Sequence, residues 1–414
     1  MPILVPPGQP APAQTAPSVP APAPPPAAAP NVGPPAIGVL LPLSGRYQSF
    51  GESCLRGIRL ALGALEGRIP LVRTVILDSH GEPATASASF QKLAADLGMV
   101  AVLGPMLSPE VEAVQSYAAS AGLPALEFSQ RAVGIGGPLF RFTLTKEDQA
   151  RVLAQYATAD LRLRRWATLH PEDSYGREIA TYFRLAVEPL GGRVLADVGY
   201  DPGKADLQAE AKRLQAKLGV VEKQPPPIDG VFLPDSAERL SMLLSYLEFV
   251  DIRGVQLLGA SGWDHPQALL SAGPAVNGAV FVDGFFVYSF RPEVRAFVDA
   301  FRDAYHTDPG TLEAYGYDAA MLLRELIAMG GTDRLRMTAL LRRPYARRGA
   351  TAETVLTPEG RIEKGLFVLK VEDGTVHEVE TTASTAALAA PADARSSGRP
   401  PEWDSRSMED RIGH

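Results

Sequence analysis

The sequence contains little cysteine and little histidine. Among 414 residues the single cysteine, Cys54, excludes an internal disulfide and a cluster of thiolate ligands. The six histidines are scattered, and no two stand at the i, i+4 spacing of a helical metal site. We therefore expect no metal and no cofactor, and we expect Cys54, in a predicted helix, to be a small buried apolar residue.

Phosphate-binding and catalytic motifs are also missing. No GxxxxGK[ST] or GxGxxG pattern follows a predicted strand, so the sequence does not indicate a nucleotide. The segment GASGW at 259–263 is similar to a nucleophile elbow, but it lacks the final glycine and nothing marks a partner histidine. The sequence therefore predicts a protein that is not an enzyme.

The charge balance gives no reason to expect nucleic acid as a partner. Lysine and arginine total 40 against 47 aspartates and glutamates, a net charge of −7, which would not attract a polyanion or an anionic membrane surface. No apolar run reaches the roughly 18 residues that cross a bilayer. One basic cluster stands out, which we predict to be a solvated loop: Arg342, Arg343, Arg347 and Arg348.

The two ends of the chain differ in composition from the rest. Residues 1–36 hold 14 of the 37 prolines and no charged residue, which predicts an extended Pro/Ala-rich tether. Residues 381–414 are rich in Ala, Ser, Pro and charge without a sustained period, which predicts a disordered tail. The opening MPILVPP has neither the basic n-region nor the long apolar h-region of a signal peptide. Either the protein is cytoplasmic, or the chain begins after a signal that was removed or missed.

Strand and helix patterns alternate between these ends. Residues 37–41 form a continuous apolar run, typical of a parallel strand covered on both faces. A loop at 44–51 follows, and then a helix for which Ser53 is the expected N-cap. Similar units recur over residues 72–128 and 140–259. Each series predicts a doubly wound parallel sheet, and two such sheets predict two lobes.

The later part of the chain has a different pattern. Two helices, at 293–306 and 311–329, follow the second series without a sheet of their own, and we expect them to return to the first lobe. An apolar run at 365–371 with a turn at 372–374 predicts a late hairpin. A chain that passes between lobes several times forms a hinge.

Five segments in sequence order resemble the type I periplasmic binding proteins, in particular the leucine, isoleucine and valine binding branch that delivers ligands to ABC importers. The resemblance implies an α/β fold of two Rossmann-like lobes with parallel sheets, joined by a hinge of three crossovers and closing on a ligand. It places the first lobe at 37–143 plus 285–350 and the second at 144–284 plus 351–380. The segments are IGVLLPLSGRYQSFGESCLRGIRLAL, VAVLGPMLSPEVEAVQSYAASAGLPAL, LFRFTLTKEDQA, DSYG and EAYGYDAAMLL.

The resemblance also implies a ligand pocket. On the first lobe the pocket falls on Ser44 to Phe50, with Phe50 at a position that is usually aromatic, and on Ser108 at a helix amino end that suits a carboxylate. On the second lobe, Tyr175 in DSYG matches an aromatic residue that lies over the ligand. Without the resemblance, Ser108 is equally well explained as a capping serine and Tyr175 as a packed surface tyrosine.

The sequence departs from the family pattern after Ser129. The family usually continues there with small residues and a threonine hydroxyl, whereas this chain has Gln130 and Arg131. Arg131 is either a fork that holds an acidic ligand or a solvated side chain. We include Ser129 and Arg131 in the predicted pocket.

A second departure follows the strand at 255–259. The family often places an acid there for the ammonium group of the ligand, whereas this chain has Ala260 and Ser261. Asp235 and Asp264 are the candidate replacements. We include Ser261 and Asp235 in the predicted pocket, and recognition of an aliphatic amino acid is thereby left open.

The sequence thus predicts a non-catalytic solute-binding protein of the periplasm or cell envelope that closes on a small polar ligand for an ABC importer. An alternative stays open, because the lipoproteins that activate penicillin-binding proteins have the same fold. An uncharged tether ahead of the first strand suits a lipid-anchored envelope protein. The expected protein partner is therefore either the membrane subunits of an importer or a penicillin-binding protein.

Overall fold

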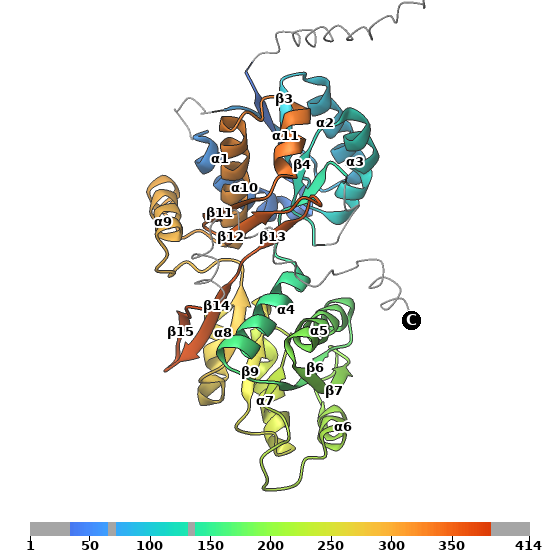
Figure 1. Ribbon diagram of the computed structural model, residues 1–414, viewed down its shortest axis with the longest axis vertical. Coiled ribbons are helices and arrows are strands. Elements are labelled where there is room, and N and C mark those ends of the chain that lie inside the picture. Colours follow the sequence, from blue (N-terminus) through green and yellow to red (C-terminus); the bar gives the residue numbers. More distant parts are fainter. Residues whose placement is uncertain (1–33, 65–71, 131–136, 382–414) are drawn as a thin grey trace, which may run out of the picture. The chain divides into compact units, whose positions relative to one another are not determined.

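A sheet of five parallel strands forms the first part of the computed structural model, which describes residues 34–64, 72–130 and 137–381 (Figure 1). The strand at 37–41 is an inner, parallel strand, and the prediction of a parallel strand from its continuous apolar run is confirmed. In spatial order the strands are β2 (Arg73–Asp78), β1 (Ala36–Leu41), β3 (Met99–Leu103), β4 (Ala125–Glu127) and β5 (Leu139–Arg141).

Helices cover both faces of this first sheet. Ile37 and Val39 of β1 pack in one apolar core with the helix pair α1 (Gln48–Leu62) and α10 (Thr311–Ala328). Ala36 and Leu40, which alternate with them, pack in a second core with α2 (Pro83–Ala95) and α3 (Ser108–Ala121). Because successive side chains of a strand point to opposite faces, this two-sided cover requires an unbroken apolar strand.

Helix α1 starts earlier than the sequence analysis predicted. It begins at Gln48 and continues from the short 3-10 turn η1 (Gly45–Tyr47), so Ser53 lies inside the helix and is not its N-cap. The early start depends on Gly51, where a Cβ would lie 2.1 Å from the carbonyl oxygen of Pro42. The loop after β1 is therefore short, and Phe50 belongs to the first turns of α1 rather than to a loop.

A second sheet contains seven strands, of which five are parallel. The hairpin predicted at 365–374 is confirmed as an antiparallel pair at one edge. In spatial order the strands are β15 (Thr375–Glu378), β14 (Phe367–Glu372), β10 (Val280–Asp283), β9 (Gln256–Gly259), β8 (Gly230–Phe232), β6 (Arg165–Pro171) and β7 (Arg193–Tyr200).

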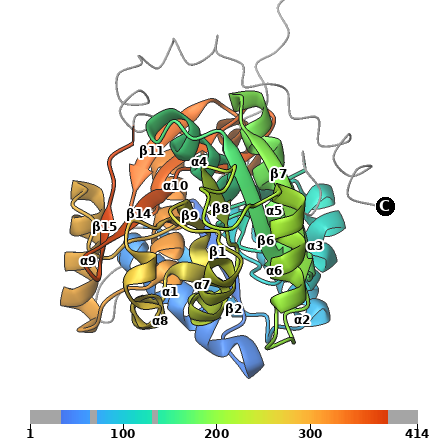
Figure 2. The same ribbon diagram turned by 90° about the horizontal axis from the view of Figure 1, so that it is seen from below.

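The second sheet is also covered on both faces (Figure 2). On one face Trp166, Phe183 and Phe232 pack ring to ring, with centroids 5.7 Å apart for the first pair and 4.5 Å apart for the second. On the other face Leu169 and Val231 belong to a separate apolar core. The covering helices are α4 (Lys146–Gln155), α5 (Ser174–Val187), α6 (Gln208–Leu218), α7 (Leu240–Phe249) and α8 (Pro266–Ser271).

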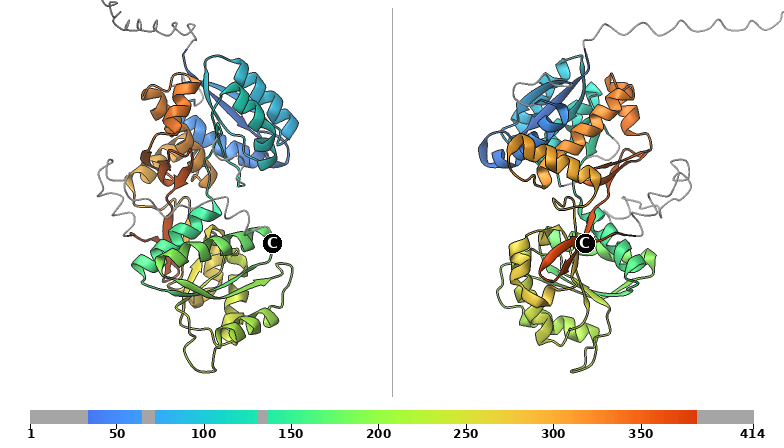
Figure 3. Two further views of the ribbon diagram at one scale, coloured as in Figure 1. Left: turned by 45° about the vertical axis from the view of Figure 1, so that its right-hand side comes forward. Right: turned by 90° about the vertical axis from the view of Figure 1, so that its left-hand side faces the viewer.

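The two later helices pack against elements of the first part of the chain, as predicted, and Figures 1 and 3 show the orange helices beside the blue α1. α10 lies along α1, where a Cβ on Gly57 would approach the carbonyl oxygen of Glu313 to 1.9 Å. α9 (Pro292–Tyr305) contacts α1, and an additional helix, α11 (Arg334–Leu341), contacts β3. Glycine is required at 57 because the two helix backbones are nearly in contact.

A small antiparallel sheet was not predicted. It consists of β11 (Tyr345–Gly349), β12 (Ala352–Leu356) and β13 (Ile362–Lys364). Part of the basic cluster lies on it, and the prediction of a solvated loop was wrong for Arg347. The side chain of Arg347 is only 8% exposed and pairs with Asp318 and Glu325, both at 3.1 Å. Arg347 is buried because its guanidinium pairs with two acids on α10, which the sequence pattern around Arg347 does not reveal.

The predicted fold class is confirmed: the protein is an α/β molecule with two sheets built mainly from parallel strands. The exact lobe boundaries stay a prediction. The predicted tether and tail lie almost wholly outside the described residues. Within the described residues, every helix is too short or too polar to cross a membrane.

Candidate functional site

The carboxyl ends of β1, β3 and β4 lie side by side, because these strands are neighbours in the first sheet. Ser44 follows β1, Ser108 follows β3 and Ser129 follows β4. In open parallel sheets this edge is where ligands bind. The topology therefore brings together three of the residues that the sequence predicted for the pocket, and Arg131, the next in sequence, lies outside the described residues.

Ser44 belongs to a polar network between the loops after β1 and β2. Its hydroxyl lies 2.6 Å from Nδ1 of His80, and that nitrogen lies 3.4 Å from a carboxylate oxygen of Asp78. Asp78 also accepts the main-chain N–H groups of Leu43 at 2.8 Å and His80 at 2.7 Å. Hydrogen bonding holds the pKa of Asp78 below its usual value despite partial burial. The network fixes the loop that carries Ser44.

Phe50 and Ser108 are accessible at this edge. Phe50 is 50% exposed and packs against Tyr47 at a ring-centroid distance of 6.5 Å. Ser108 is half-buried and is the first residue of α3, so it is not the N-cap; that position belongs to Leu107. Glu110 caps the helix instead, since its carboxylate accepts the Leu107 N–H at 3.1 Å. The Ser108 hydroxyl is therefore not the group that caps α3.

Ser129 lies deeper than the other two serines. It is 1% exposed, and its N–H donates to the Glu127 carboxylate at 2.6 Å. Burial raises the pKa of Glu127 to about 7. The next residue, Gln130, donates its side-chain amide to Thr143 at 3.3 Å. The first edge thus combines hydroxyl and amide groups with the buried carboxyls of Glu110 and Glu127, each of which accepts a nearby main-chain N–H.

The second sheet offers an equivalent edge. β6, β8, β9 and β10 are neighbours, and their carboxyl ends lead to Tyr175, Asp235, Ser261 and Asp283 in that order. The first three were predicted for the pocket. Tyr175 lies in the first turn of α5, with the Lys146 ammonium 5.9 Å from its ring centroid. Burial raises the pKa of its phenol, and the Asp235 carboxylate raises it further.

Asp235 is engaged in interactions within the protein. Its carboxylate accepts the Tyr200 hydroxyl, lies 3.0 Å from Nε of Arg239, and accepts the Ser236 N–H at 2.7 Å. Its side chain is only 11% exposed. The charge that the sequence analysis proposed for a ligand ammonium is therefore already balanced by Arg239.

The main chain of Ser261 is hydrogen-bonded to a side chain of α4. Its N–H donates to the side-chain oxygen of the buried Gln149 on α4 at 2.9 Å. The chain then forms the 3-10 turn η5 (Ser261–Trp263) and reaches Asp264. Burial raises the pKa of Asp283 well above its usual value, and the nearby Asp264 carboxyl raises it further. Asp283 was not among the predicted pocket residues. Its signal was available, because an acid ends the apolar run VFVD at the carboxyl end of a parallel strand.

A buried lysine lies where the chain passes between the sheets. Lys364, at the end of β13, is fully buried, and its ammonium donates to Thr351 at 2.7 Å and Thr354 at 2.6 Å. It also lies 4.4 Å from the ring centroid of Phe142 and 5.3 Å from that of Tyr315. Burial lowers the pKa of Lys364 to about 8. The sequence did not indicate this cluster, because Phe142 and Tyr315 come from segments distant from the one that carries Thr351, Thr354 and Lys364.

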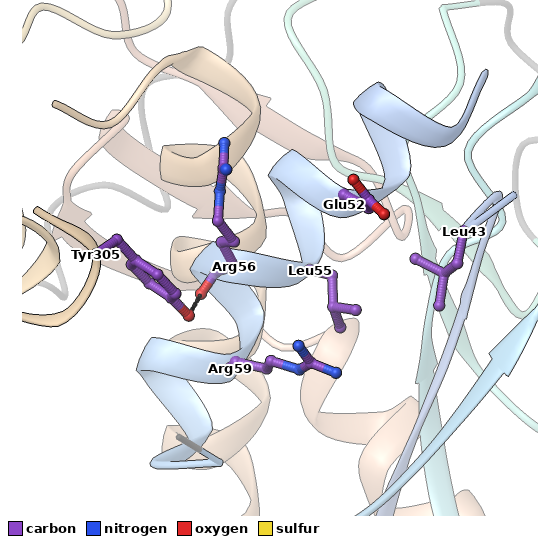
Figure 4. Close-up of a pocket in the computed structure, with 6 residues that line it drawn as sticks. All are labelled: Leu43, Glu52, Leu55, Arg56, Arg59 and Tyr305. Carbon is purple, nitrogen blue, oxygen red and sulfur yellow. Dashed lines mark hydrogen bonds between the residues drawn. The ribbon is translucent and has the colours of Figure 1, made fainter. Parts of the chain in front are cut away.

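A hollow of about 430 Å³ lies along α1 (Figure 4). Of the seven predicted pocket residues that the structure describes, none lines it. The Tyr305 hydroxyl donates to the main-chain oxygen of Arg56, and the Arg56 guanidinium pairs with Glu313. The lining residues are Leu43, Glu52, Leu55, Arg56, Arg59 and Tyr305. Within the described ranges we find no group of three or more His, Cys, Asp or Glu side chains that could hold a metal ion.

Known proteins are similar in sequence to part of this chain. An amino acid binding protein of Pseudomonas aeruginosa is 27% identical over 194 residues, which cover 44% of this chain and 50% of that protein. The penicillin-binding protein activator LpoA of Photobacterium profundum is 24% identical over 314 residues, 70% of this chain and 50% of that protein. The chain thus spans about half the length of the curated relatives it matches.

Solved structures share the fold. A putative branched-chain amino acid ABC transporter protein from Rhodospirillum rubrum has a TM-score of 0.71 and 24% identity, over 84% of this chain and 100% of that one. An ABC transporter substrate-binding protein from Desulfitobacterium hafniense in complex with Leu has a TM-score of 0.60 and 24% identity, over 83% and 99%. A solute-binding protein from R. palustris in complex with benzoate has a TM-score of 0.56 and 21% identity, over 84% and 96%.

The family assignment comes from the match to a whole-family model. The model described as periplasmic binding protein matches residues 34–375, which include every strand of the two large sheets except the last residues of β15. Two sheets built mainly from parallel strands, with polar groups at their carboxyl edges, agree with that match. The chain belongs to the periplasmic binding protein family.

Proposed function

We propose that this protein is a non-catalytic, extracytoplasmic solute-binding protein that delivers a small polar ligand to an ABC importer. One observation carries the proposal: in a chain of the periplasmic binding protein family, Ser44, Ser108 and Ser129 share one carboxyl edge, and Tyr175, Asp235 and Ser261 share another. Two edges of this kind, on separate sheets, are suited to hold a ligand from opposite sides.

The first edge is the proposed docking surface. The amino end of α3 with Ser108 and the half-exposed Phe50 offer a hydroxyl, a positive helix end and an apolar ring. This combination suits a ligand with a carboxylate and an apolar body. Relatives of the same fold were solved with Leu, isoleucine, benzoate and 4-hydroxybenzoate, all of which carry a carboxylate.

Closure is the proposed response to the ligand. The chain crosses between the two sheets after β5, after β10 and after β13, so three segments form the proposed hinge. Tyr175 and its neighbours on the second edge then complete the contacts. A ligand shifts the equilibrium between open and closed forms only as far as it prefers the closed form. The membrane subunits of the importer are the proposed reader of the closed form.

Thermal unfolding with a ligand panel tests the proposal. The panel contains the L-amino acids, aliphatic and aromatic carboxylates, and amines, each at a large excess. A true ligand at a hundredfold excess over its Kd stabilises the folded protein by about 2.7 kcal/mol. Ser108→Ala combined with Tyr175→Ala removes this gain, whereas Ser120→Ala, at the other end of α3, retains it. A double variant that keeps the full response would overturn the site assignment, and a flat panel would overturn the function.

A second function has one specific observation in its favour. The alignment with the penicillin-binding protein activator covers 314 residues, against 194 for the amino acid binding protein. If activation of a penicillin-binding protein is the function, the ligand panel stays flat and the full chain retains a purified penicillin-binding protein in a pull-down. The double variant Ser108→Ala and Tyr175→Ala would not change that capture.

A further inference from the structure

One histidine of the second sheet is buried at the carboxyl end of β6. His170 is 5% exposed, whereas the side chain of Asp197, on the neighbouring strand β7, is half-exposed. The Nδ1 atom of His170 lies 2.8 Å from the main-chain oxygen of Pro171, and its Nε2 atom lies 3.2 Å from Oδ1 of Asp197. The Thr168 hydroxyl donates to the same carboxylate oxygen. Both ring nitrogens of His170 therefore face an oxygen that accepts hydrogen bonds.

Only the charged imidazolium form of His170 satisfies both contacts. A carbonyl oxygen cannot donate a hydrogen bond, and neither can an ionised carboxylate, so each ring nitrogen must carry a hydrogen. A neutral imidazole has a single N–H, and either tautomer leaves a lone pair directed at an acceptor. Deprotonation of His170 therefore breaks one of the two contacts and sets two acceptors against each other.

The charged groups around His170 also favour the imidazolium. Asp197 on β7 and Glu172 in the turn after β6 are the acids that act on it. Lys217 of α6 acts on Asp197 and donates to the main-chain oxygen of that residue at 2.7 Å. Arg177 of α5 donates to the main-chain oxygen of Glu172. Burial lowers the pKa of His170, but its hydrogen bonds and the two acids outweigh burial and raise the pKa above its usual value.

His170 lies at the base of the turn that leads to Tyr175. The Pro171 oxygen, which His170 contacts, is also the point where α5 packs on the strand end, since a Cβ on Gly176 would lie 2.1 Å from it. Asp173 in the same turn caps α5 by accepting the Gly176 N–H at 2.8 Å. Tyr175 lies between these two residues, in the first turn of the helix. The position of Tyr175 thus depends on the strand end that His170 holds.

The same turn is also connected to Asp235. The Glu172 N–H, two residues after His170, donates to the main-chain oxygen of Tyr200 at 2.7 Å. The Tyr200 hydroxyl in turn donates to the Asp235 carboxylate. His170 therefore lies where two connections start, one to Tyr175 and one to Asp235, and both of these residues were predicted for the pocket.

We propose that His170 is a positioning residue of the second edge, and that its imidazolium form holds the turn from which Tyr175 meets the ligand. This inference rests on the proposed solute-binding function and adds a regulation of that function by pH. In the charged form both ring nitrogens are bonded and the turn is fixed. In the neutral form the turn loses one anchor, at the Pro171 oxygen or at Asp197, and the second edge holds the ligand less tightly.

The direction of the pH effect follows from the charge of the bonded form. The pKa of His170 is higher in the folded protein than in the unfolded chain, so the stability that its contacts supply is complete in acid and is lost as pH rises through the folded-state value. Affinity for a ligand that Tyr175 contacts falls in the same direction by about 3- to 10-fold, the equivalent of one hydrogen bond. Binding that does not depend on this turn shows no such fall.

Nuclear magnetic resonance of the full chain tests the positioning without a ligand. The Cε1 proton resonance of His170, assigned by its loss in His170→Gln, reports the charge of the ring, and the main-chain amide resonances of Tyr175 and Gly176 report the turn. All are followed from about pH 5.5 to 9. We expect the two amide resonances to shift with the midpoint of His170 and to stay constant in His170→Gln. Amide resonances that do not follow that midpoint would overturn the inference.

Asp197→Asn separates the charge of the pair from its packing. The neutral amide no longer favours the imidazolium, so the midpoint of His170 moves to lower pH, and the midpoint of the Tyr175 amide resonance moves with it. Because the Asp197 side chain is half-exposed, this variant also tests the inference if His170→Gln does not fold. A Tyr175 midpoint that stays in place while that of His170 moves contradicts the inference.

Affinity measurements connect the histidine to the ligand. The probes are L-leucine, L-isoleucine, benzoate and 4-hydroxybenzoate, and titration calorimetry measures the Kd of each at about pH 6 and 8.5. For a probe that binds, we expect weaker binding at the higher pH in the wild type and a constant Kd in His170→Gln. His377→Gln, at an exposed histidine of β15, is the matched control and keeps the wild-type pH dependence.

The outcomes separate this inference from the proposed function. A bound probe whose Kd is the same at both pH values in the wild type overturns the inference and leaves the solute-binding function standing. Absence of binding by every probe counts against the proposed function, whereas the amide resonances of Tyr175 and Gly176 still decide whether His170 positions the turn.

Discussion

The carboxyl edges of the two sheets have the same topology but hold their acids in different ways. On the first, Asp78, Glu110 and Glu127 accept main-chain N–H groups of nearby residues. On the second, the Asp235 carboxylate lies 3.0 Å from Nε of Arg239 and accepts the Tyr200 hydroxyl. The acids of the first edge are thus held by main-chain hydrogen bonds, whereas Asp235 is also held by a charged side chain.

The largest effect is expected on the second edge. Asp235→Ala leaves the Arg239 guanidinium and the buried Tyr200 hydroxyl without their acceptor, and lowers the free energy of unfolding by about 3 to 4 kcal/mol. Urea unfolding at neutral pH measures it. A loss below about 1 kcal/mol would show that this charged group contributes no more than the hydroxyls of the first edge.

A pH-dependent effect of similar size is expected on the first edge. The folded-state pKa of Glu127, about 7, lies above its unfolded value, so its contribution to stability is complete in acid and is lost as pH rises through 7. The loss amounts to about 3 kcal/mol. Glu127→Gln, which keeps an acceptor for the Ser129 N–H, removes this decline. Unfolding free energies from pH 4.5 to 8 that remain parallel in the two proteins would contradict the prediction.

The smallest effect on the free energy of unfolding is expected for Ser44, in the hydrogen-bond network that holds the loop after β1. Ser44→Ala removes one hydrogen bond to His80 and lowers the free energy of unfolding by about 0.5 to 1 kcal/mol, because the network is partly exposed and Asp78 still holds the loop. Urea unfolding with Ser120→Ala as the control measures it. A cost as large as that of Asp235→Ala would remove the contrast between the edges.

Local patterns were enough to predict the elements and their order. Apolar runs such as 37–41 and 99–103 mark strands covered on both faces, and turn residues mark their carboxyl ends. The candidate residues that follow those strands can therefore be assigned to one shared edge of a sheet without any knowledge of side-chain contacts. The start of α1 was missed because it depends on the approach of Gly51 to Pro42, a contact between a strand end and a helix.

The alternation of strands and helices, and with it two mainly parallel sheets whose polar loops lie at their carboxyl edges, could be predicted from local patterns alone. The partners of the buried charges are known only from the folded molecule: Arg239 for Asp235, and Asp318 and Glu325 for Arg347. The difference lies in the range of the interactions involved. Periodicity is a property of neighbouring residues, whereas the partner of a buried charge is set by elements that meet only after the chain has folded.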